Sequence, residues 1–428
     1  MPYPKNLPEL KARQKANLQQ AVKTAYQKSR YYREVMDKLG LTPEKIKTVK
    51  DLPAIPPTFK KNLRERNWDF VCIDRGQWRD VYSTSGSTGS SVYIPLSHRD
   101  LALMGKLGGE TLKLIGLTPR DLVQLTLPMG NWMWAAGHGF YYCYTSLGAG
   151  VLRFGPGFTD KQIELLENLD ATVVHGIPSF LVKLGEAVKA KGAKTKVRRL
   201  VSIAENVINL ELDRNRLGKK IEELWGLPLF STYGASERPF LCGECRLRAG
   251  MHIHPDEMLV EILDPKTLEP LPEGEKGLVT FTSFKVEGFP LLRYAPGDLS
   301  FLVPGVCECG AVSQRLGPIY ARTDHMMKIK GVMIYPERVS EVVAQVEEVG
   351  AFQLEAYTEN FMDQLRVYFT VKAGANPEAA AKKLAVFLKH RLNISMETIP
   401  QNDKQLAERI FPPGINKAKT FLDNRSKN

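Results

Sequence analysis

The chain has 428 residues and a formal net charge of +12, with 43% hydrophobic and 25% charged residues. These fractions are ordinary for a soluble globular protein and exclude a disordered polyelectrolyte, while the length allows two or three domains. Residues 1–66 contain 16 Lys and Arg against 6 Asp and Glu, which leaves only +2 for residues 67–428. A polyanion-binding surface is therefore an expectation for the N-terminal end alone.

Residues 1–66 are expected to form helices whose basic side chains face solvent. Apolar residues recur at helical spacing, at Leu18, Ala21, Val22 and Ala25, and the basic residues lie mostly between them. The opening stretch MPYPKNLPELKARQKANLQQ has charges where a secretory signal needs an apolar region. We therefore expect a cytoplasmic protein.

Residues 122–152 contain no Asp, Glu, Lys or Arg. Pro128, Asn131, His138 and five glycines interrupt this stretch too often for a helix that faces lipid. It predicts buried core and the wall of a pocket.

The middle of the chain alternates short apolar runs with helical patterns, which favours an α/β domain with mostly parallel strands. The expected strands lie within residues 121–127, 148–154, 171–177 and 198–204. Two later runs, residues 257–265 and 276–284, predict a more antiparallel β-rich portion with a turn at PLPEGEKG.

The last hundred residues predict a small α+β unit. A helix within residues 336–349 places Val339, Val342, Val343 and Val346 on one face. A strand follows in which Leu365, Val367, Phe369 and Val371 alternate inward, and then a helix capped by Asn376 and Pro377 buries Leu384, Phe387, Leu388 and Leu392. The predicted domains are 1–323, large and α/β, and 324–428, small and α+β.

The most informative stretch is YSTSGSTGSSVYIPLS, residues 82–97. Its hydroxyls and glycines form a loop whose backbone can approach a polyphosphate and whose N–H and O–H groups can surround it. It lacks both the P-loop pattern and the GxGxxG of a dinucleotide fold. We interpret it as a phosphate loop of neither type.

Three downstream motifs stand in a fixed order with this loop: STYGASE at 231–237, PLLRYAPGDL at 290–299 and ARTDHMMKIKGVMIYPERVSEVV at 321–343. Together the four motifs resemble those of the acyl-adenylate-forming ligase superfamily. Within it the chain is most similar to phenylacetate-CoA ligases, because SRYYREVM, DLPAIPPTFKKNL and the ECxxxxGxHI and GExG segments also match. The resemblance runs from about Tyr31 to Arg425.

The resemblance implies an enzyme that binds ATP and a carboxylic acid, forms an acyl-AMP and passes the acyl group to coenzyme A. Glu237 would hold Mg²⁺, which prefers carboxylate and phosphate oxygens. Tyr233 would stack on adenine and Asp298 would accept hydrogen bonds from the ribose. The implied nucleotide- and coenzyme-binding residues are Ser85, Gly86, Ser87, Thr88, Gly89, Tyr233, Gly234, Asp298, Arg322, Lys330 and Gly331.

The resemblance also implies a small C-terminal domain that rotates about a hinge at Asp324 between two half-reactions. The adenylation lysine would be Lys417 in NKAK, with Lys419 as the alternative. After rotation, the segment around Lys330 and Gly331 would line the pantetheine tunnel. Two positions depart from the family pattern, because Asn416 and Ala321 stand where the family has glycines.

Six cysteines in a chain without a secretory signal favour metal ligation over disulfides. CGEC, two histidines and CECG supply soft ligands in two clusters: Cys242, Cys245, His252, His254, Cys307 and Cys309. The family's ECxxxxGxHI segment favours a structural zinc on Cys245, His252, Cys307 and Cys309, with Cys242 in reserve and His254 as another alternative. Cys72 and Cys143 are expected to be ordinary buried thiols.

The acid pocket of the family would here be lined by aromatic and apolar residues, which favours a flat or apolar acid. Its candidates are Trp132, Trp134, Phe140, Tyr141, Ile177, Pro178, Ala204 and Glu205. Core packing explains these aromatic residues equally well.

The sequence therefore predicts an ATP- and Mg²⁺-dependent ligase that joins an aryl or arylacetic acid to coenzyme A, expected as a homodimer without a nucleic-acid or membrane partner. The alternative is an adenylate-forming enzyme with another acceptor: a carrier-protein thiol, a cofactor hydroxyl or an amine. A rival of another class is a basic protein that holds nucleic acid or an anionic surface through residues 1–66.

Overall fold

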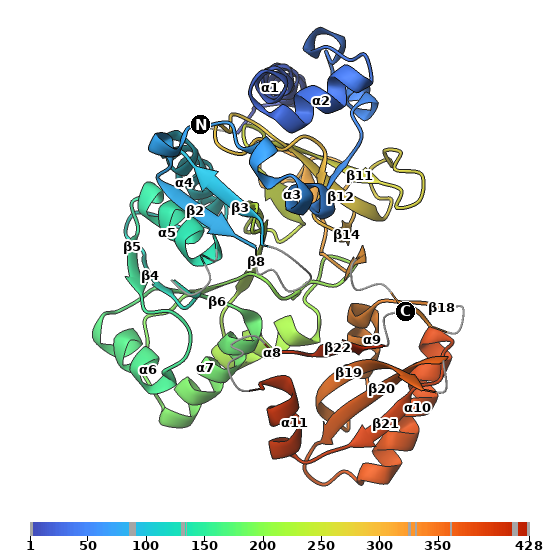
Figure 1. Cartoon of the computed structure of the whole chain (residues 1–428). Coiled ribbons are helices and arrows are strands. Elements are labelled where there is room, and N and C mark those ends of the chain that lie inside the picture. Colours follow the sequence, from blue (N-terminus) through green and yellow to red (C-terminus); the bar gives the residue numbers. More distant parts are fainter. Residues whose placement is uncertain are drawn as a thin grey trace. The chain divides into compact units, whose positions relative to one another are not determined.

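The fold divides into two compact units, Met1–Ile319 and Tyr320–Asn428 (Figure 1). The computed structural model describes residues 3–84, 91–129, 133, 135–323, 327–329, 332–359, 362–412 and 418–425. Both units combine helices with sheets, so the predicted α/β and α+β fold classes are confirmed.

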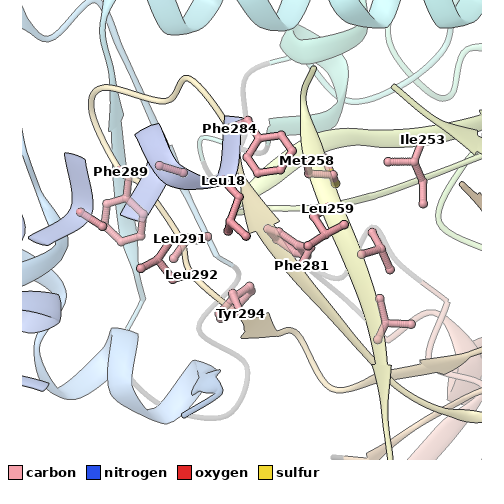
Figure 2. Close-up of a cluster of buried hydrophobic side chains, with 14 of the residues drawn as sticks. Leu18, Ile253, Met258, Leu259, Phe281, Phe284, Phe289, Leu291, Leu292 and Tyr294 are labelled. Carbon is pink, nitrogen blue, oxygen red and sulfur yellow. The ribbon is translucent and has the colours of Figure 1, made fainter. Parts of the chain in front are cut away.

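The first part of the chain is helical, as the sequence predicts. Its elements are α1 (Leu7–Lys28), α2 (Arg30–Lys38), η1 (Pro43–Lys45), η2 (Val49–Ala54), α3 (Lys60–Glu65), η3 (Asn67–Phe70) and η4 (Arg75–Gln77). Asn6 caps α1 with its side chain. The four predicted apolar residues of α1 are buried: Leu18, Ala21, Val22 and Ala25. Figure 2 shows Leu18 pointing from α1 into a cluster that includes Phe281 and Leu291.

The larger sheet of the first unit runs in the order β15-β10-β9-β8-β7-β6-β4-β5. Its strands are β4 (Leu122–Leu125), β5 (Gly150–Arg153), β6 (Val173–Gly176), β7 (Arg199–Ser202), β8 (Leu229–Ala235), β9 (Arg238–Glu244), β10 (Met251–Ile253) and β15 (Arg315–Leu316). The pairs from β5 through β8 are parallel, and those from β8 through β15 are antiparallel. All four predicted parallel strands are confirmed as β4 to β7.

Helices connect the parallel strands, as parallel pairing requires. They are α5 (Ala135–Leu147), α6 (Thr159–Asn168), α7 (Pro178–Lys191) and α8 (Arg216–Trp225), with α4 (His98–Lys113) before β4. The uncharged stretch 122–152 thus forms β4, α5 and β5. None of the helices in the described part of the chain has the length and apolar character that crossing a membrane requires.

A second sheet of this unit has the order β1-β13-β12-β14, with β11 beside β12. Its strands are β1 (Thr58–Phe59), β11 (Met258–Leu263), β12 (Gly277–Ser283), β13 (Tyr294–Ala295) and β14 (Asp298–Ser300). The predicted antiparallel pair is confirmed, because β11 and β12 align from Met258↔Ser283 to Leu263↔Leu278. A separate antiparallel hairpin consists of β2 (Asp80–Ser83) and β3 (Tyr93–Leu96).

The second unit has a sheet in the order β21-β20-β19-β22 and its own buried core. Its elements are β16 (Ala321–Arg322), β17 (Met327–Ile329), β18 (Val332–Ile334), α9 (Pro336–Val343), β19 (Val349–Glu359), β20 (Met362–Val371), α10 (Pro377–Leu392), β21 (Glu397–Pro400), α11 (Asp403–Ile410) and β22 (Phe421–Asn424). The Asn376 cap is confirmed, since its side chain accepts a hydrogen bond from Ala379 N–H.

The helix expected within residues 336–349 is shorter than that range. α9 ends at Val343, and tight turns follow in which Gln345 and Val346 donate to the carbonyls three residues before them. The apolar positions are nevertheless as predicted, because Val339, Val342, Val343 and Val346 are all buried. Strand β19 begins at Val349, so the helical pattern cannot continue beyond these turns.

Candidate functional site

The predicted phosphate loop joins β2 to β3. Tyr82 pairs with Ile94 and Ser83 with Tyr93, and Thr84 closes the pair by accepting a hydrogen bond from Val92 N–H at 3.0 Å through its hydroxyl. A short antiparallel hairpin therefore holds both ends of the loop. The loop candidates themselves, Ser85, Gly86, Ser87, Thr88 and Gly89, lie outside the described residues.

Tyr233 and Asp298 come together, although 65 residues separate them. Tyr233 lies near the end of β8, followed by Gly234, and Asp298 opens β14 after Gly297, whose φ of +95° favours glycine. The Tyr233 hydroxyl donates to Asp298 Oδ2, and the carboxylate is buried. The pair therefore places the aromatic ring of Tyr233 next to the buried carboxylate of Asp298, which is a hydrogen-bond acceptor.

Glu237 lies in the turn between β8 and β9, with only 5% of its surface exposed. The hydroxyl of Tyr294 on β13 donates to Glu237 Oε1 at 2.6 Å. Burial, with the Glu237 charge as a smaller contribution, raises the pKa of Tyr294 well above its usual value, so the hydroxyl keeps its proton and remains a donor. The sequence predicted Glu237 but not Tyr294, although Tyr294 lies inside the motif at 290–299.

The remaining nucleotide and coenzyme candidates belong to the second unit. Arg322 ends the short strand β16 and is half-buried. Lys419, the alternative lysine, is exposed just before β22, and its backbone N–H donates to the Ile410 carbonyl. The hinge, tunnel and adenylation candidates Asp324, Lys330, Gly331 and Lys417 lie outside the described residues.

Two acid-pocket candidates lie on α5. Phe140 is fully buried, and its ring meets that of His175 edge-on at 4.2 Å. Tyr141 is half-buried, with the Arg153 guanidinium 5.0 Å from its ring centre. Trp132 and Trp134 lie outside the described residues. Phe140 therefore packs in the core against His175 of β6, the strand that leads to Ile177.

The other acid-pocket candidates lie around the start of α7 and the end of β7. Ile177 is half-buried and is the N-cap of α7, and Pro178, the first residue of the helix, is buried. Glu205 accepts hydrogen bonds from Ser179 N–H at 2.7 Å and from its hydroxyl at 2.8 Å, so its carboxylate caps α7. Ala204 is exposed, with a φ of +78°.

The sequence did not single out His175, which is buried on β6 beside these candidates. Tyr144 Oη lies 2.9 Å from His175 Nδ1, and burial lowers the pKa of His175 to about 3, so its imidazole is neutral. In the sequence it is one histidine in an apolar run and gives no distinct signal.

Cys245, His252, Cys307 and Cys309 form a compact cluster, with their ligand atoms all within 4.8 Å of one another. Cys245 follows β9, His252 lies on β10, and both other cysteines lie in the loop between β14 and β15. The Cys245 and Cys307 sulfurs are 3.8 Å apart, and Cys309 Sγ is 3.4 Å from His252 Nε2. Three thiols and one imidazole are a donor set that suits tetrahedral zinc.

The surroundings of the cluster fit a bound cation. Burial lowers the pKa of His252 to about 4, which leaves the neutral imidazole that metals bind, and Ser313 Oγ lies 2.9 Å from its Nδ1. Burial, followed by smaller contributions that include the neighbouring thiols, raises the pKa of Cys245, and it raises the pKa of Cys309 to about 12. Adjacent thiolates repel in the absence of a cation, and a divalent ion would remove this cost.

The alternative ligands lie elsewhere. Cys242 is buried in β9, opposite Ile253, and the His254 ring packs 4.8 Å from that of Tyr3, with its Nδ1 accepting from Asp256 N–H at 3.2 Å. Neither belongs to the four-residue cluster. Cys143 is fully buried, and Cys72 is partly buried.

Comparison with known proteins matches residues 56–286 to the AMP-binding enzyme family and residues 331–425 to the AMP-binding enzyme C-terminal domain. The chain is 31% identical to the phenylacetate-coenzyme A ligase of Thermus thermophilus over 419 residues, covering 95% of this chain and 93% of the relative. It is 27% identical to that of Aromatoleum evansii over 432 residues, covering 98% and 95%.

Among solved structures, a 2-hydroxyisobutyryl-CoA ligase in the postadenylation state, in complex with 2-HIB-AMP, has the same fold. Its TM-score is 0.84 at 20% identity, over 97% of this chain and 90% of that one. The match to the family covers more than half of the chain and includes the Tyr233 and Glu237 motif. The chain therefore belongs to the family of AMP-binding enzymes, within which it is similar to phenylacetate-CoA ligases.

Proposed function

We propose that this protein is an ATP-dependent acid:CoA ligase for an aryl or arylacetic acid. The acid's carboxylate attacks the α-phosphorus of ATP, which forms the acyl-AMP and releases pyrophosphate. The thiol of coenzyme A then attacks the acyl carbon, gives up its proton and displaces AMP. The similarity to phenylacetate-coenzyme A ligases over almost the whole chain supports this reaction.

The observation that carries the proposal is the pair of hydroxyl–carboxylate contacts made by the two central motifs. Tyr233 is bonded to Asp298, and Tyr294 is bonded to Glu237. Asp298 is suited to accept hydrogen bonds from ribose hydroxyls while Tyr233 offers its ring to adenine. Ser85 to Gly89 would surround the phosphates, and Lys417 would bridge the acid and the α-phosphate.

Glu237 fits a magnesium site of the kind that nucleotide-dependent enzymes use. Mg²⁺ in such sites is bound through one or two carboxylates together with substrate phosphates and water. Glu237 supplies one such carboxylate, and the Tyr294 hydroxyl holds its Oε1. The bound ion would neutralise charge on the phosphates when the carboxylate of the acid approaches them.

We infer that the Cys245, His252, Cys307 and Cys309 cluster holds a structural zinc. Four protein ligands close a tetrahedral site and leave no open position for catalysis. The thiols also accord with the reducing cytoplasm that the sequence predicts. A homodimer remains part of the proposal from the family resemblance.

A pyrophosphate-release screen tests the proposed function. Aryl, arylacetic and short fatty acids are each incubated with the protein, ATP and Mg²⁺, with and without coenzyme A. We expect an aromatic acid to give sustained release of pyrophosphate and AMP only when coenzyme A is present. Turnover with an amine or a carrier protein but not with coenzyme A would establish the other acceptor class, and no release with any acid would reject an acid-activating enzyme.

A further inference from the structure

The turn that carries Glu237 is short and has buried residues at its end. Ala235 on β8 pairs with Arg238 on β9, so only Ser236 and Glu237 lie between the two strands. Glu237 and Arg238 are adjacent, and they are exposed by only 5% and 4%. A displacement of Arg238 therefore moves the Glu237 backbone directly.

Each of these two neighbours has a partner in the second sheet. Tyr294 donates to Glu237, and Arg238 Nη2 donates to Glu257 Oε1 at 2.8 Å. Tyr294 lies on β13, and Glu257 directly precedes β11. Phe281 of β12 pairs with Tyr294 on one side and with Val260 of β11 on the other, so one sheet supplies both partners. Figure 2 shows Phe281 and Tyr294 in the buried cluster at this sheet.

Glu257 is fixed by its own backbone. Its N–H donates to the His254 carbonyl at 2.9 Å, and its carbonyl accepts from Phe284 N–H at 2.7 Å. Its side chain is 1% exposed and that of Arg238 is 5% exposed, so solvent does not screen the ion pair. Glu237 of the β8–β9 turn and Arg238 directly after it are thus each hydrogen-bonded to a residue in or next to the second sheet.

We propose that the Arg238–Glu257 pair is a positioning pair that aims the Glu237 carboxylate at the metal ion bound with ATP. The assignment rests on the proposed function, because it takes Glu237 as the Mg²⁺ ligand. Arg238 and Glu257 act through the turn and do not touch the ion. Loss of the pair leaves the Tyr294 contact as the only described side-chain hydrogen bond between the turn and the second sheet, and weakens metal binding.

The energetics of buried ion pairs favour a positioning role over a stabilising one. Removing two charges from water costs several kcal/mol per ion, and apolar residues of similar volume often stabilise a protein equally well or better. Arg238 Nε and Glu257 Oε2 also have no hydrogen-bond partner, so the pair leaves part of its desolvation cost uncompensated. The pair therefore contributes little net stability. Its presence next to Glu237 is better explained by the orientation that it gives to the Glu237 carboxylate.

The deciding variant is the double substitution Arg238→Met with Glu257→Leu, which removes both charges together and so preserves the fold. Metal binding is measured with Mn²⁺, from the electron paramagnetic resonance signal of free Mn²⁺ in the presence of ATP. We expect Mn²⁺ affinity to fall about 10-fold, as when a partner of a metal ligand is lost, with an unchanged unfolding midpoint. Wild-type Mn²⁺ affinity in this double variant overturns the proposal.

Enzyme kinetics supply a second measurement. In the double variant the Mg²⁺ concentration for half-maximal pyrophosphate release should rise about 10-fold, while kcat at saturating Mg²⁺ stays near that of the wild type. The single substitution Glu257→Gln keeps an oxygen that accepts from Arg238, and it should retain wild-type Mn²⁺ affinity. Equal loss of affinity in Glu257→Gln would contradict an effect that acts through this hydrogen bond.

Asp121→Asn is the matched control for a buried carboxylate. Asp121 lies just before β4, and its side chain is fully buried while it accepts from Arg198 at 2.6 Å. This variant should lose stability and keep its Mn²⁺ affinity. If it loses as much Mn²⁺ affinity as the double variant, then any loss of stability weakens metal binding, and the proposal is overturned. Mn²⁺ binding with ATP requires no turnover. If the wild type releases no pyrophosphate, the proposed function is rejected, but the Mn²⁺ affinities of the variants can still be compared.

Discussion

Lys417 is the residue for which sequence and chemistry make the sharpest kinetic prediction. A lysine that bridges the attacking carboxylate and the α-phosphate is needed when the acyl-AMP forms but not when coenzyme A consumes it. Lys417→Ala should therefore abolish pyrophosphate release and leave thioester formation from synthetic acyl-AMP largely intact. Lys419→Ala is the comparison, because exposed Lys419 is the alternative lysine, and loss of pyrophosphate release in that variant instead would move the assignment to Lys419. Equal loss of both half-reactions in Lys417→Ala would remove the assignment.

Glu257 predicts a pH dependence of stability. Burial raises its pKa from 4.5 to about 7, with Arg238 opposing, and among the described residues its charge in turn acts on Cys242, Cys143 and Tyr3. Between pH 4.5 and about pH 7, Glu257 keeps its proton in the native state but has released it in the unfolded chain. The resulting stabilisation is complete below pH 4.5 and is lost as the pH rises through 7.

The shift corresponds to about 3 kcal/mol, and it is measured as the difference in unfolding free energy between wild type and Glu257→Gln at pH 5, 6, 7 and 8. The wild type should lose stability relative to the variant as the pH rises, because only Glu257 can release the proton. A difference that is constant over this range would show that Glu257 has the same pKa in both states.

At the scale of elements, two glycines of α4, Gly105 and Gly109, face the backbone of α5. A Cβ on Gly105 would lie 2.8 Å from the Tyr142 carbonyl oxygen. This atom belongs to the backbone of α5 and cannot move aside as the end of a flexible side chain could. Gly105→Ala should push α5 away and lower the unfolding free energy by about 1–3 kcal/mol. Since α5 carries Phe140 and Tyr141, the KM for the acid should rise more than the KM for ATP.

Gly76→Ala is the control for this prediction, because a Cβ at Gly76 would meet no atom within 4 Å. It should leave both stability and the two KM values unchanged. If Gly105→Ala behaves in the same way, then α5 tolerates the displacement and does not shape the acid pocket.

The elements themselves were largely predictable, and the contacts between them were not. Val173 and Val174 stand in an apolar run between turn signals, so local pattern sufficed to predict β6. Val346 shows the limit, since its burial follows the helical pattern but the chain has already left α9 for a turn. The pattern records which side of an element faces the core and is less informative about where the element ends.

The site shows the same division. Glu237 and Asp298 were found from their motifs, whereas Tyr294 and Glu257 were not, because their partners lie 57 residues away and 19 residues away in the chain. Six cysteine and histidine candidates stood out because these residue types are few and their spacing is restrictive, and the family resemblance then favoured the four that form the cluster. Buried arginine and glutamate look in the sequence like any charged surface residues.

At the scale of the whole molecule, the two units have separate cores, and the Cys/His cluster belongs to only one of them. Cys245 and Cys307 are 62 residues apart, so a metal ion there ties two distant loops of the first unit. The second unit has its own buried cluster around Val339, Leu354 and Leu384. Metal removal should therefore destabilise the first unit and spare the second.

We expect one zinc per chain by elemental analysis in reducing buffer. Incubation with a strong chelator should lower the midpoint of one calorimetric unfolding transition by at least about 5 °C, since each kcal/mol moves a large domain by a few degrees. A second transition should keep its midpoint. Cys307→Ser should reproduce the effect without chelator, while Cys72→Ser, which lies outside the cluster, should keep both the zinc and the midpoint. A chelator effect on both transitions alike would mean that the two units unfold as one.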